Sequence, residues 1–269
     1  ILRGHMPESF LEEIRNDAVC DTAASDRTDS DRPRRPRIHF TVQTGWINDP
    51  NGFCFYHGEY HLFCQFNPYS AEWATMHWGH WTSKDLLHWN WHGVALAPDQ
   101  PYDQSGCFSG HAIADGDVLY LLYTGVKTGE DGLEYQQQCL AKSDDGFNFV
   151  KSENNPVVPT ALQPEGSMAA DFRDPKVFRH GEGFRIMVAS KGPSGGDYLF
   201  YDSADLEHWV FVKKHIEGLG TMLECPDYFT LDGHEHAAGR PSLSQYAACR
   251  FHAGCRNQGS RLRFDRLRL

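Results

Sequence analysis

A seven-residue segment recurs three times in this chain at a fixed interval of 60 residues. Its copies are SKDLLHW at 83–89, SDDGFNF at 143–149 and SADLEHW at 203–209. Each copy follows a strand-like run and ends on a large aromatic residue. Such a period, with several strands per unit, is typical of a β-propeller, whose blades are small antiparallel sheets that bury their faces against one another. The repeat therefore predicts an all-β propeller.

The sequence around the repeats agrees with this fold class. From residue 38 to about residue 231, short apolar and aromatic runs are bounded by Gly, Asp, Asn or Pro, and no run keeps a helical period. The chain is 13% aromatic and contains 25 Gly and 14 Pro, which suits short strands joined by turns. Three turn signals between such runs predict β-hairpins: His57-Gly58, Asp115-Gly116 and Gly181-Glu182-Gly183.

Composition divides the 269 residues into three segments. Residues 1–37 are rich in charged residues, Ser and Pro and are expected to form a flexible arm. Residues 38–233 are expected to be the propeller, and the 60-residue period fits about four blades into them. Residues 234–269 form an atypical Arg-rich tail, expected to be non-native in sequence or disordered; a basic functional tail is the alternative.

Several functional classes are disfavoured by composition. A formal charge of −11 argues against nucleic-acid binding, which needs clustered Lys and Arg. No apolar run approaches the ~20 residues of a membrane span, and the first residues lack the apolar centre of a secretory signal. Eight cysteines without a CxxC pair indicate neither a zinc site nor a disulfide framework, so we expect no metal, no cofactor and a cytoplasmic location.

Three acidic residues occupy similar local sequences. Asp49 in NDPNG, Asp174 in RDPK and Glu224 in ECPD each precede a strand-like run, with Pro one or two residues behind. Because the first strands of successive blades line the central channel of a propeller, acids at their entrances would converge there. Proline fixes φ and helps to hold such an entrance rigid.

Convergent carboxyl groups are what glycoside hydrolysis requires. One must be ionised to attack the anomeric carbon, and another must be protonated to donate to the leaving oxygen. Asp49 has polar neighbours in Asn48 and Asn51, which suits the ionised role. Glu224 follows Leu223 and is expected to have apolar surroundings that favour its protonated form.

The same segments resemble a known family. WINDPNG, FRDPKVF and ECPDYF are similar to the three signature blocks of glycoside hydrolase family 32, which includes invertases, sucrose-6-phosphate hydrolases and fructanases. FCQFNP at 63–68, HWGHW at 77–81 and CFSG at 107–110 resemble its intervening blocks in the same order. The resemblance implies a five-bladed propeller followed by a β-sandwich. Since it ends near residue 233, we expect an incomplete last blade and no sandwich.

The resemblance also implies a role for individual residues. Asp49 becomes the nucleophile, Glu224 the general acid/base and Asp174 the transition-state stabiliser. The implied sugar contacts are Asn48, Gln65, Trp73, Phe108, Ser109 and Arg173. His111 and Leu223 depart from the residues common at these positions, which affects the expected leaving-group preference.

The function expected from the sequence is retaining cleavage of a β-fructofuranosyl bond through a fructosyl-enzyme. The substrate would be a small sugar: sucrose, sucrose 6-phosphate or a short fructo-oligosaccharide, with no nucleic-acid or membrane partner. Two alternatives stay open, an inactive truncated family member that at most binds sugar, and a fructosyltransferase. The sequence does not give the oligomeric state.

Overall fold

The computed structural model of the chain describes residues 40–42, 44–216, 222–231, 234–241 and 265–266. These residues form four antiparallel sheets, named A to D in chain order. Sheet A comprises β1 (Trp46–Tyr56), β2 (Glu59–Asn67), β3 (His77–Ser83) and β4 (Asn90–Leu96). Sheet B comprises β5 (Gly106–Asp115), β6 (Val118–Thr128), β7 (Glu134–Ser143) and β8 (Val150–Lys151). Sheet C comprises β9 (Phe172–His180), β10 (Gly183–Gly192), β11 (Gly195–Ser203) and β12 (Val210–Ile216). Sheet D comprises β13 (Leu223–Leu231), β14 (His234–Pro241) and β15 (Asp265–Arg266).

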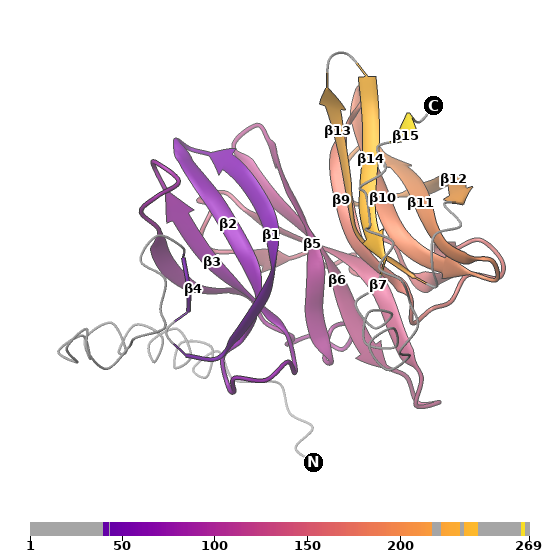
Figure 1. Ribbon diagram of the computed structural model, residues 1–269, viewed down its shortest axis with the longest axis horizontal. Helices are drawn as coiled ribbons and strands as arrows, with labels where there is room; N and C mark the ends of the chain where they lie inside the picture. Colours follow the sequence, from indigo (N-terminus) through magenta and orange to yellow (C-terminus); the bar gives the residue numbers. More distant parts are fainter. Residues whose placement is uncertain (1–39, 43, 217–221, 232–233, 242–264, 267–269) are drawn as a thin grey trace, which may run out of the picture.

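Each sheet is a meander in which consecutive strands pair. The first strands of the four sheets contact one another in succession, β1 with β5, β5 with β9 and β9 with β13, and lie toward the middle of the molecule (Figure 1). Repeated meanders arranged around their first strands are the architecture of a propeller. The predicted all-β, propeller-type fold is therefore confirmed. The described residues supply four sheets, and a fifth blade stays a prediction.

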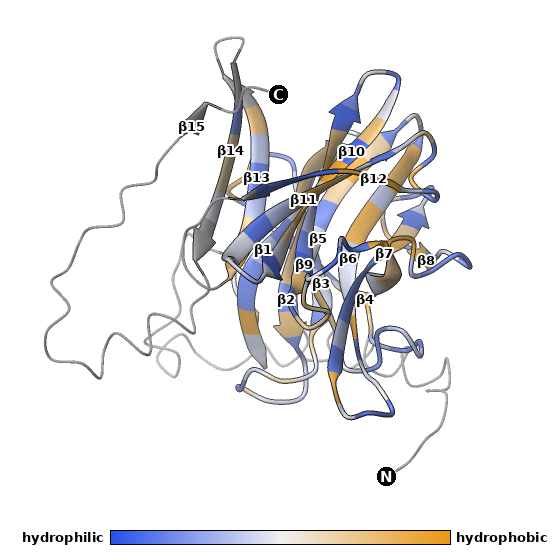
Figure 2. Ribbon diagram, turned by 90° about the vertical axis from the view of Figure 1, so that its right-hand side faces the viewer, coloured by the Kyte–Doolittle hydropathy of each residue, from blue (hydrophilic) through white to orange (hydrophobic). Residues whose placement is uncertain are grey.

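The core consists of layers between neighbouring sheets. One buried cluster joins sheets A and B, with Phe63 and Trp78 packed against Leu121. A second joins B and C, where Leu140 meets Phe172, and a third joins C and D. Hydrophobic and hydrophilic residues alternate in bands along the strands (Figure 2), as expected for side chains that point to opposite faces. Within the described residues, no helix has the length and apolarity to cross a membrane.

The three sequence repeats form the same turn in sheets A, B and C. Each connects the third strand of its sheet to the fourth. In the first copy, the Ser83 hydroxyl accepts a hydrogen bond from the Leu86 N–H, and Asp85 Oδ1 accepts two from the next backbone amides. Ser143 with Asp145, and Ser203 with Asp205, make the equivalent bonds. The repeat is thus a side-chain-stabilised turn that marks each blade.

The expected domain limit at residue 233 falls inside sheet D. β14 begins at His234 and pairs with β13 from Leu231↔His234 to Leu223↔Pro241. The sheet therefore continues eight residues beyond the predicted limit. The composition change there does not stop backbone pairing, because ladder hydrogen bonds do not depend on side-chain type. The predicted arm, residues 1–37, and most of the predicted tail lie outside the described residues.

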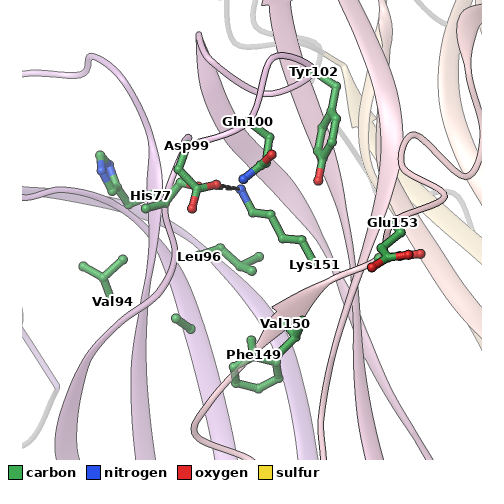
Figure 3. Close-up of a pocket in the computed structure, with 13 residues that line it drawn as sticks. His77, Val94, Leu96, Asp99, Gln100, Tyr102, Phe149, Val150, Lys151 and Glu153 are labelled. Carbon is green, nitrogen blue, oxygen red and sulfur yellow. Dashed lines mark hydrogen bonds and ion pairs between the residues drawn. The ribbon is translucent and has the colours of Figure 1, made fainter. Parts of the chain in front are cut away.

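A buried ion pair network ties sheet B to the segment that follows sheet A. The Lys151 ammonium on β8 lies 2.6 Å from Asp99 Oδ1, 2.5 Å from Asp103 Oδ2 and 2.6 Å from the Ala97 carbonyl. Figure 3 shows Lys151 and Asp99 in the pocket between β4 and β8. The Asp103 side chain is completely buried, and burial raises the pKa of this carboxyl while Lys151 opposes the rise. The ion pair with Lys151 therefore offsets part of the effect of burial on Asp103.

Lys151→Met is expected to lower the free energy of unfolding by about 3 kcal/mol, because it leaves the buried Asp103 without its counter-ion. Lys142→Met is the matched control, since Lys142 is exposed on the neighbouring strand β7. We expect the control to change stability by less than ~0.5 kcal/mol. Urea denaturation of both variants measures the difference. Equal effects of the two substitutions would show that the Lys151 network adds nothing to the fold.

Candidate active site

A single cleft collects every site residue predicted from the sequence. It has a volume of about 660 Å³, and the predicted residues that line it are Asn48, Asp49, Gln65, Trp73, Phe108, Ser109, Arg173, Asp174 and Glu224. They come from the first strands of all four sheets, together with β2 and the segment after it. The fold therefore brings Asp49, Asp174 and Glu224 together in one cleft, as the sequence predicted.

The acids do not precede the strands, as the sequence suggested, but lie within them, Asp49 and Asp174 in β-bulges and Glu224 directly before one. Between Ile47 and Pro50, two residues of β1 (Asn48 and Asp49) face one residue of β2. The same two-against-one arrangement places Asp174 and Pro175 in β9, and Cys225 and Pro226 in β13. In β5, Ser109 is the extra residue. A bulge breaks the strict alternation of side chains and re-aims them, so each inner strand can direct a functional group into the cleft.

Pro175 and Pro226 are tolerated in these bulges because a bulge leaves a residue out of the ladder. Two residues of the bulges adopt left-handed backbone conformations, Asp174 with φ 62° and Cys225 with φ 48°. Such conformations cost a non-glycine residue roughly 1 kcal/mol and concentrate at functional sites. Among the described strand residues of sheets C and D, the non-glycine residues with positive φ thus lie at or beside the cleft.

The Asp49 carboxylate is held from two sides. The Ser109 hydroxyl donates a hydrogen bond to Asp49 Oδ2 at 3.1 Å. The Cys225 thiol lies 3.8 Å from the same oxygen. Because Cys225 directly follows Glu224 in β13, these contacts place the Asp49 carboxylate next to the strand that carries the third acid.

Glu224 pairs with Arg173. The Arg173 Nη2 donates to Glu224 Oε1 at 3.0 Å, and Nη1 donates to Asp171 Oδ1 and to Gln136 Oε1, both at 3.2 Å. The surroundings of the Glu224 carboxylate thus include a guanidinium, and not only the apolar neighbours expected from the sequence. Arg173 therefore holds the Glu224 carboxylate in place and links it to Asp171 and Gln136 in the wall of the cleft.

Asp174 is the most buried of the three acids. One of its carboxylate oxygens, Oδ2, accepts a hydrogen bond from the Cys225 N–H at 2.9 Å, and its own N–H donates to the Thr124 hydroxyl at 2.9 Å. Burial raises the pKa of Asp174 to about 6, with the negative charges of Asp49 and Glu224 acting in the same direction and Arg173 opposing them. The carboxyl is consequently ionised at neutral pH but protonates on mild acidification.

This raised pKa predicts a pH-dependent stability. Between about pH 4 and pH 6 the folded chain holds a proton on Asp174 that the unfolded chain releases, so stability falls as pH rises through this window. Asp174→Asn removes the titrating group. The variant should therefore lack this loss. Its unfolding free energy minus that of the parent should rise by roughly 3 kcal/mol between pH 4 and pH 7. Urea denaturation at several pH values measures it, and parallel curves for the two proteins would contradict the assignment.

The cleft also contains residues that the sequence analysis did not single out: Trp46, Glu134, Gln136, Ala170 and Asp171. Gln136 is central among them, because its Oε1 accepts from both the Phe172 N–H and Arg173. It belongs to the run Gln136–Gln138 on β7, whose three amide side chains are buried. Three consecutive polar residues in a buried strand were the available signal, since polar core positions mark function or a hydrogen-bonded network.

Aromatic residues form part of the cleft wall. The rings of Trp73 and Phe108 meet edge to face with centroids 5.7 Å apart, and Trp73 is 56% exposed. Trp78 is completely buried and donates its indole N–H to the Phe108 carbonyl at 3.1 Å. Trp78 therefore supports the wall from the core, whereas Trp73 lines the cleft with an exposed ring.

A propeller-type protein whose inner strands direct three carboxyl groups into one cleft has the architecture of a glycosidase. The family model for the glycosyl hydrolases family 32 N-terminal domain matches residues 39–257, and the chain belongs to this family. The predicted family membership is therefore confirmed.

Known proteins similar to this chain bear related names. A sucrose-6-phosphate hydrolase of Escherichia coli is 43% identical over 209 residues, covering 75% of this chain and 42% of that protein. A raffinose invertase of Escherichia coli is 43% identical over 202 residues, covering 72% and 41%. The structure of a GH32 β-fructofuranosidase from Bombyx mori superposes with a TM-score of 0.76 at 38% identity, covering 87% of this chain and 48% of that one. The chain thus spans less than half the length of these relatives.

Proposed function

We propose that this protein is a retaining glycoside hydrolase that cleaves the β-fructofuranosyl bond of sucrose or a related fructoside. The observation that carries the proposal is that Asp49, Asp174 and Glu224, at or directly beside bulges of the inner strands β1, β9 and β13, line one cleft. The names of the similar proteins, sucrose-6-phosphate hydrolase and β-fructofuranosidase, support the same activity. Residues 38–241 would form the catalytic propeller.

In the proposed reaction, the Asp49 carboxylate attacks the anomeric carbon of the fructosyl unit and forms an ester bond. The bond from that carbon to the leaving oxygen breaks, and the Glu224 carboxyl gives its proton to this oxygen. Water then attacks the same carbon, Glu224 takes a proton from the water, and the ester to Asp49 breaks. Asp174 accepts hydrogen bonds from the fructosyl hydroxyls, and the Ser109 hydroxyl holds Asp49 in position.

The test is the release of fructose from sucrose, sucrose 6-phosphate and raffinose by the purified chain, followed by chromatography. Proton NMR of the first product distinguishes retention from inversion, because a retaining enzyme releases the β-anomer first. Fructosyl-sugar products at high sucrose concentration would identify a transferase instead. A folded chain without turnover of any fructoside would favour the alternative of an inactive family member. The cytoplasmic location stays a prediction.

A further inference from the structure

One buried hydroxyl contacts two residues of the cleft wall, although its own residue is not among the described residues that line the cleft. Thr124 lies in β6, the second strand of sheet B, and its side chain is completely buried. The hydroxyl oxygen accepts a hydrogen bond from the Asp174 N–H at 2.9 Å. Its one proton has two acceptors within reach, the Ser109 carbonyl at 3.1 Å and Gln138 Oε1 at 3.0 Å. A single hydroxyl thus joins residues of three other strands, β5, β7 and β9.

Two of these partners are bulged residues. Ser109 is the extra residue of the β5 bulge, and Asp174 lies in the β9 bulge with its φ at 62°. A bulge interrupts the ladder, so the backbone groups of a buried bulged residue need partners outside it. The Thr124 hydroxyl offers an acceptor to the Asp174 N–H and a donor to the Ser109 carbonyl. It therefore ties the bulges of two different sheets to one point.

Gln138 fixes the position of this hydroxyl. It lies directly opposite Thr124 in the ladder between β6 and β7 and is completely buried. Its Nε2 donates to the Phe172 carbonyl at 2.9 Å, which leaves Oε1 for the Thr124 hydroxyl. Phe172 is the first residue of β9, two residues before Asp174. The amide therefore anchors the hydroxyl to the same strand whose bulge it supports.

The side chains of the two bulged residues act on different partners. The Ser109 hydroxyl donates to Asp49 Oδ2, and Asp174 Oδ2 accepts from the Cys225 N–H. Since a bulge sets the direction of its side chain, a shift of either bulge would displace these contacts. On this basis, which rests on the proposed function, we propose that Thr124 is a positioning residue: its hydroxyl keeps Ser109 on the nucleophile and Asp174 on the fructosyl hydroxyls at the same time.

A buried, hydrogen-bonded threonine also stabilises a fold without any role in a reaction, so the test needs a threonine that does only this. Thr82 on β3 is completely buried, and its Oγ1 lies 2.7 Å from His92 Nε2. Neither Thr82 nor His92 is among the described residues that line the cleft. Thr82→Val therefore removes a buried hydroxyl from sheet A without touching the cleft.

The experiment compares kcat and KM for sucrose in Thr124→Val, Thr124→Ser and Thr82→Val with those of the parent. Valine has nearly the shape of threonine but no hydroxyl, whereas serine keeps the hydroxyl. Thr124→Val should lower kcat by about 100-fold, the loss expected from a misplacement of about 1 Å, while KM changes less than about threefold. Thr124→Ser should keep at least about a third of the parent kcat, and Thr82→Val should stay within about twofold of it. Urea denaturation should show similar losses of stability for the two valine variants.

A second comparison shows whether Thr124 acts through Asp174. It uses the Asp174→Asn protein and 4-nitrophenyl β-fructofuranoside, a more reactive substrate. In this background Thr124→Val should lower kcat by no more than about tenfold, because the group that Thr124 positions is already impaired. If Thr124→Val does not fold, Thr124→Cys replaces it in both comparisons, since a thiol is only a weak donor and acceptor.

Four results overturn the inference. They are a Thr124→Val protein with the parent kcat, a Thr124→Ser protein as slow as Thr124→Val, an equal loss of kcat in Thr82→Val, and a Thr124→Val loss of the same factor with and without Asp174→Asn. A parent protein that turns over no fructoside counts against the proposed function instead. Crystal structures of the two valine variants then decide the inference. Thr124→Val should displace the Ser109 hydroxyl or the Asp174 carboxylate by about 1 Å, and Thr82→Val should not; unchanged positions in Thr124→Val overturn it.

Discussion

Asp49→Asn is expected to lower kcat for sucrose by at least about 10⁴-fold, because an amide oxygen cannot form the ester with the fructosyl carbon. The substitution is nearly isosteric, and the oxygen that accepts the Ser109 hydrogen bond can be retained. Stability should therefore change by less than ~1 kcal/mol. Initial rates of fructose release measure the loss, and urea denaturation checks the fold.

Asp117→Asn is the matched control for Asp49. Asp117 lies in the exposed turn between β5 and β6, so its substitution should leave the rate of fructose release unaltered. An Asp49→Asn protein that keeps a tenth or more of the parent rate would remove Asp49 from the role of nucleophile.

Glu224→Gln is expected to lower kcat for sucrose by about 10³-fold, since the leaving glucose is no longer protonated. The loss should depend on the leaving group. With 4-nitrophenyl β-fructofuranoside, whose leaving group departs without a proton, the first step should remain fast and give a burst of nitrophenol. The second step lacks its base, so the fructosyl-enzyme should accumulate as an adduct on the peptide that contains Asp49.

Two results would contradict this role of Glu224. One is an equal loss with sucrose and the nitrophenyl substrate, and the other is an adduct on a peptide without Asp49. Added azide should restore turnover of the nitrophenyl substrate, since it attacks without a general base. Glu182→Gln, in the exposed turn between β9 and β10, serves as the control for loss of a carboxylate.

The sequence and the structure agree on which residues belong to the cleft but differ on how the backbone presents them. The sequence suggested that Pro50, Pro175 and Pro226 mark strand entrances, because proline interrupts a ladder. The strands in fact begin upstream of the acids. Pro175 and Pro226 occupy bulges where no ladder bond is required, and Pro50 directly follows one. A bulge depends on the partner strand, so one strand's sequence cannot reveal it.

The cleft residues that sequence analysis missed also depend on contacts between separate strands. Gln136 and Asp171 contribute through Arg173, which lies far from Gln136 along the chain. Their local sequence contains no catalytic motif. Only pairing within sheet B and packing of sheet B against sheet C bring these residues to one wall of the cleft.

The sequence by itself determined the propeller-type fold, its 60-residue repeat and the identity of the three acids, because these are local patterns of turns, strand alternation and short motifs. The tertiary structure decided the continuation of sheet D through β14, the bulges that aim the acids, and the raised pKa of Asp174. The reason is physical. Register, burial and electrostatic potential are set by groups from different strands, and they come into existence only when the sheets pack together.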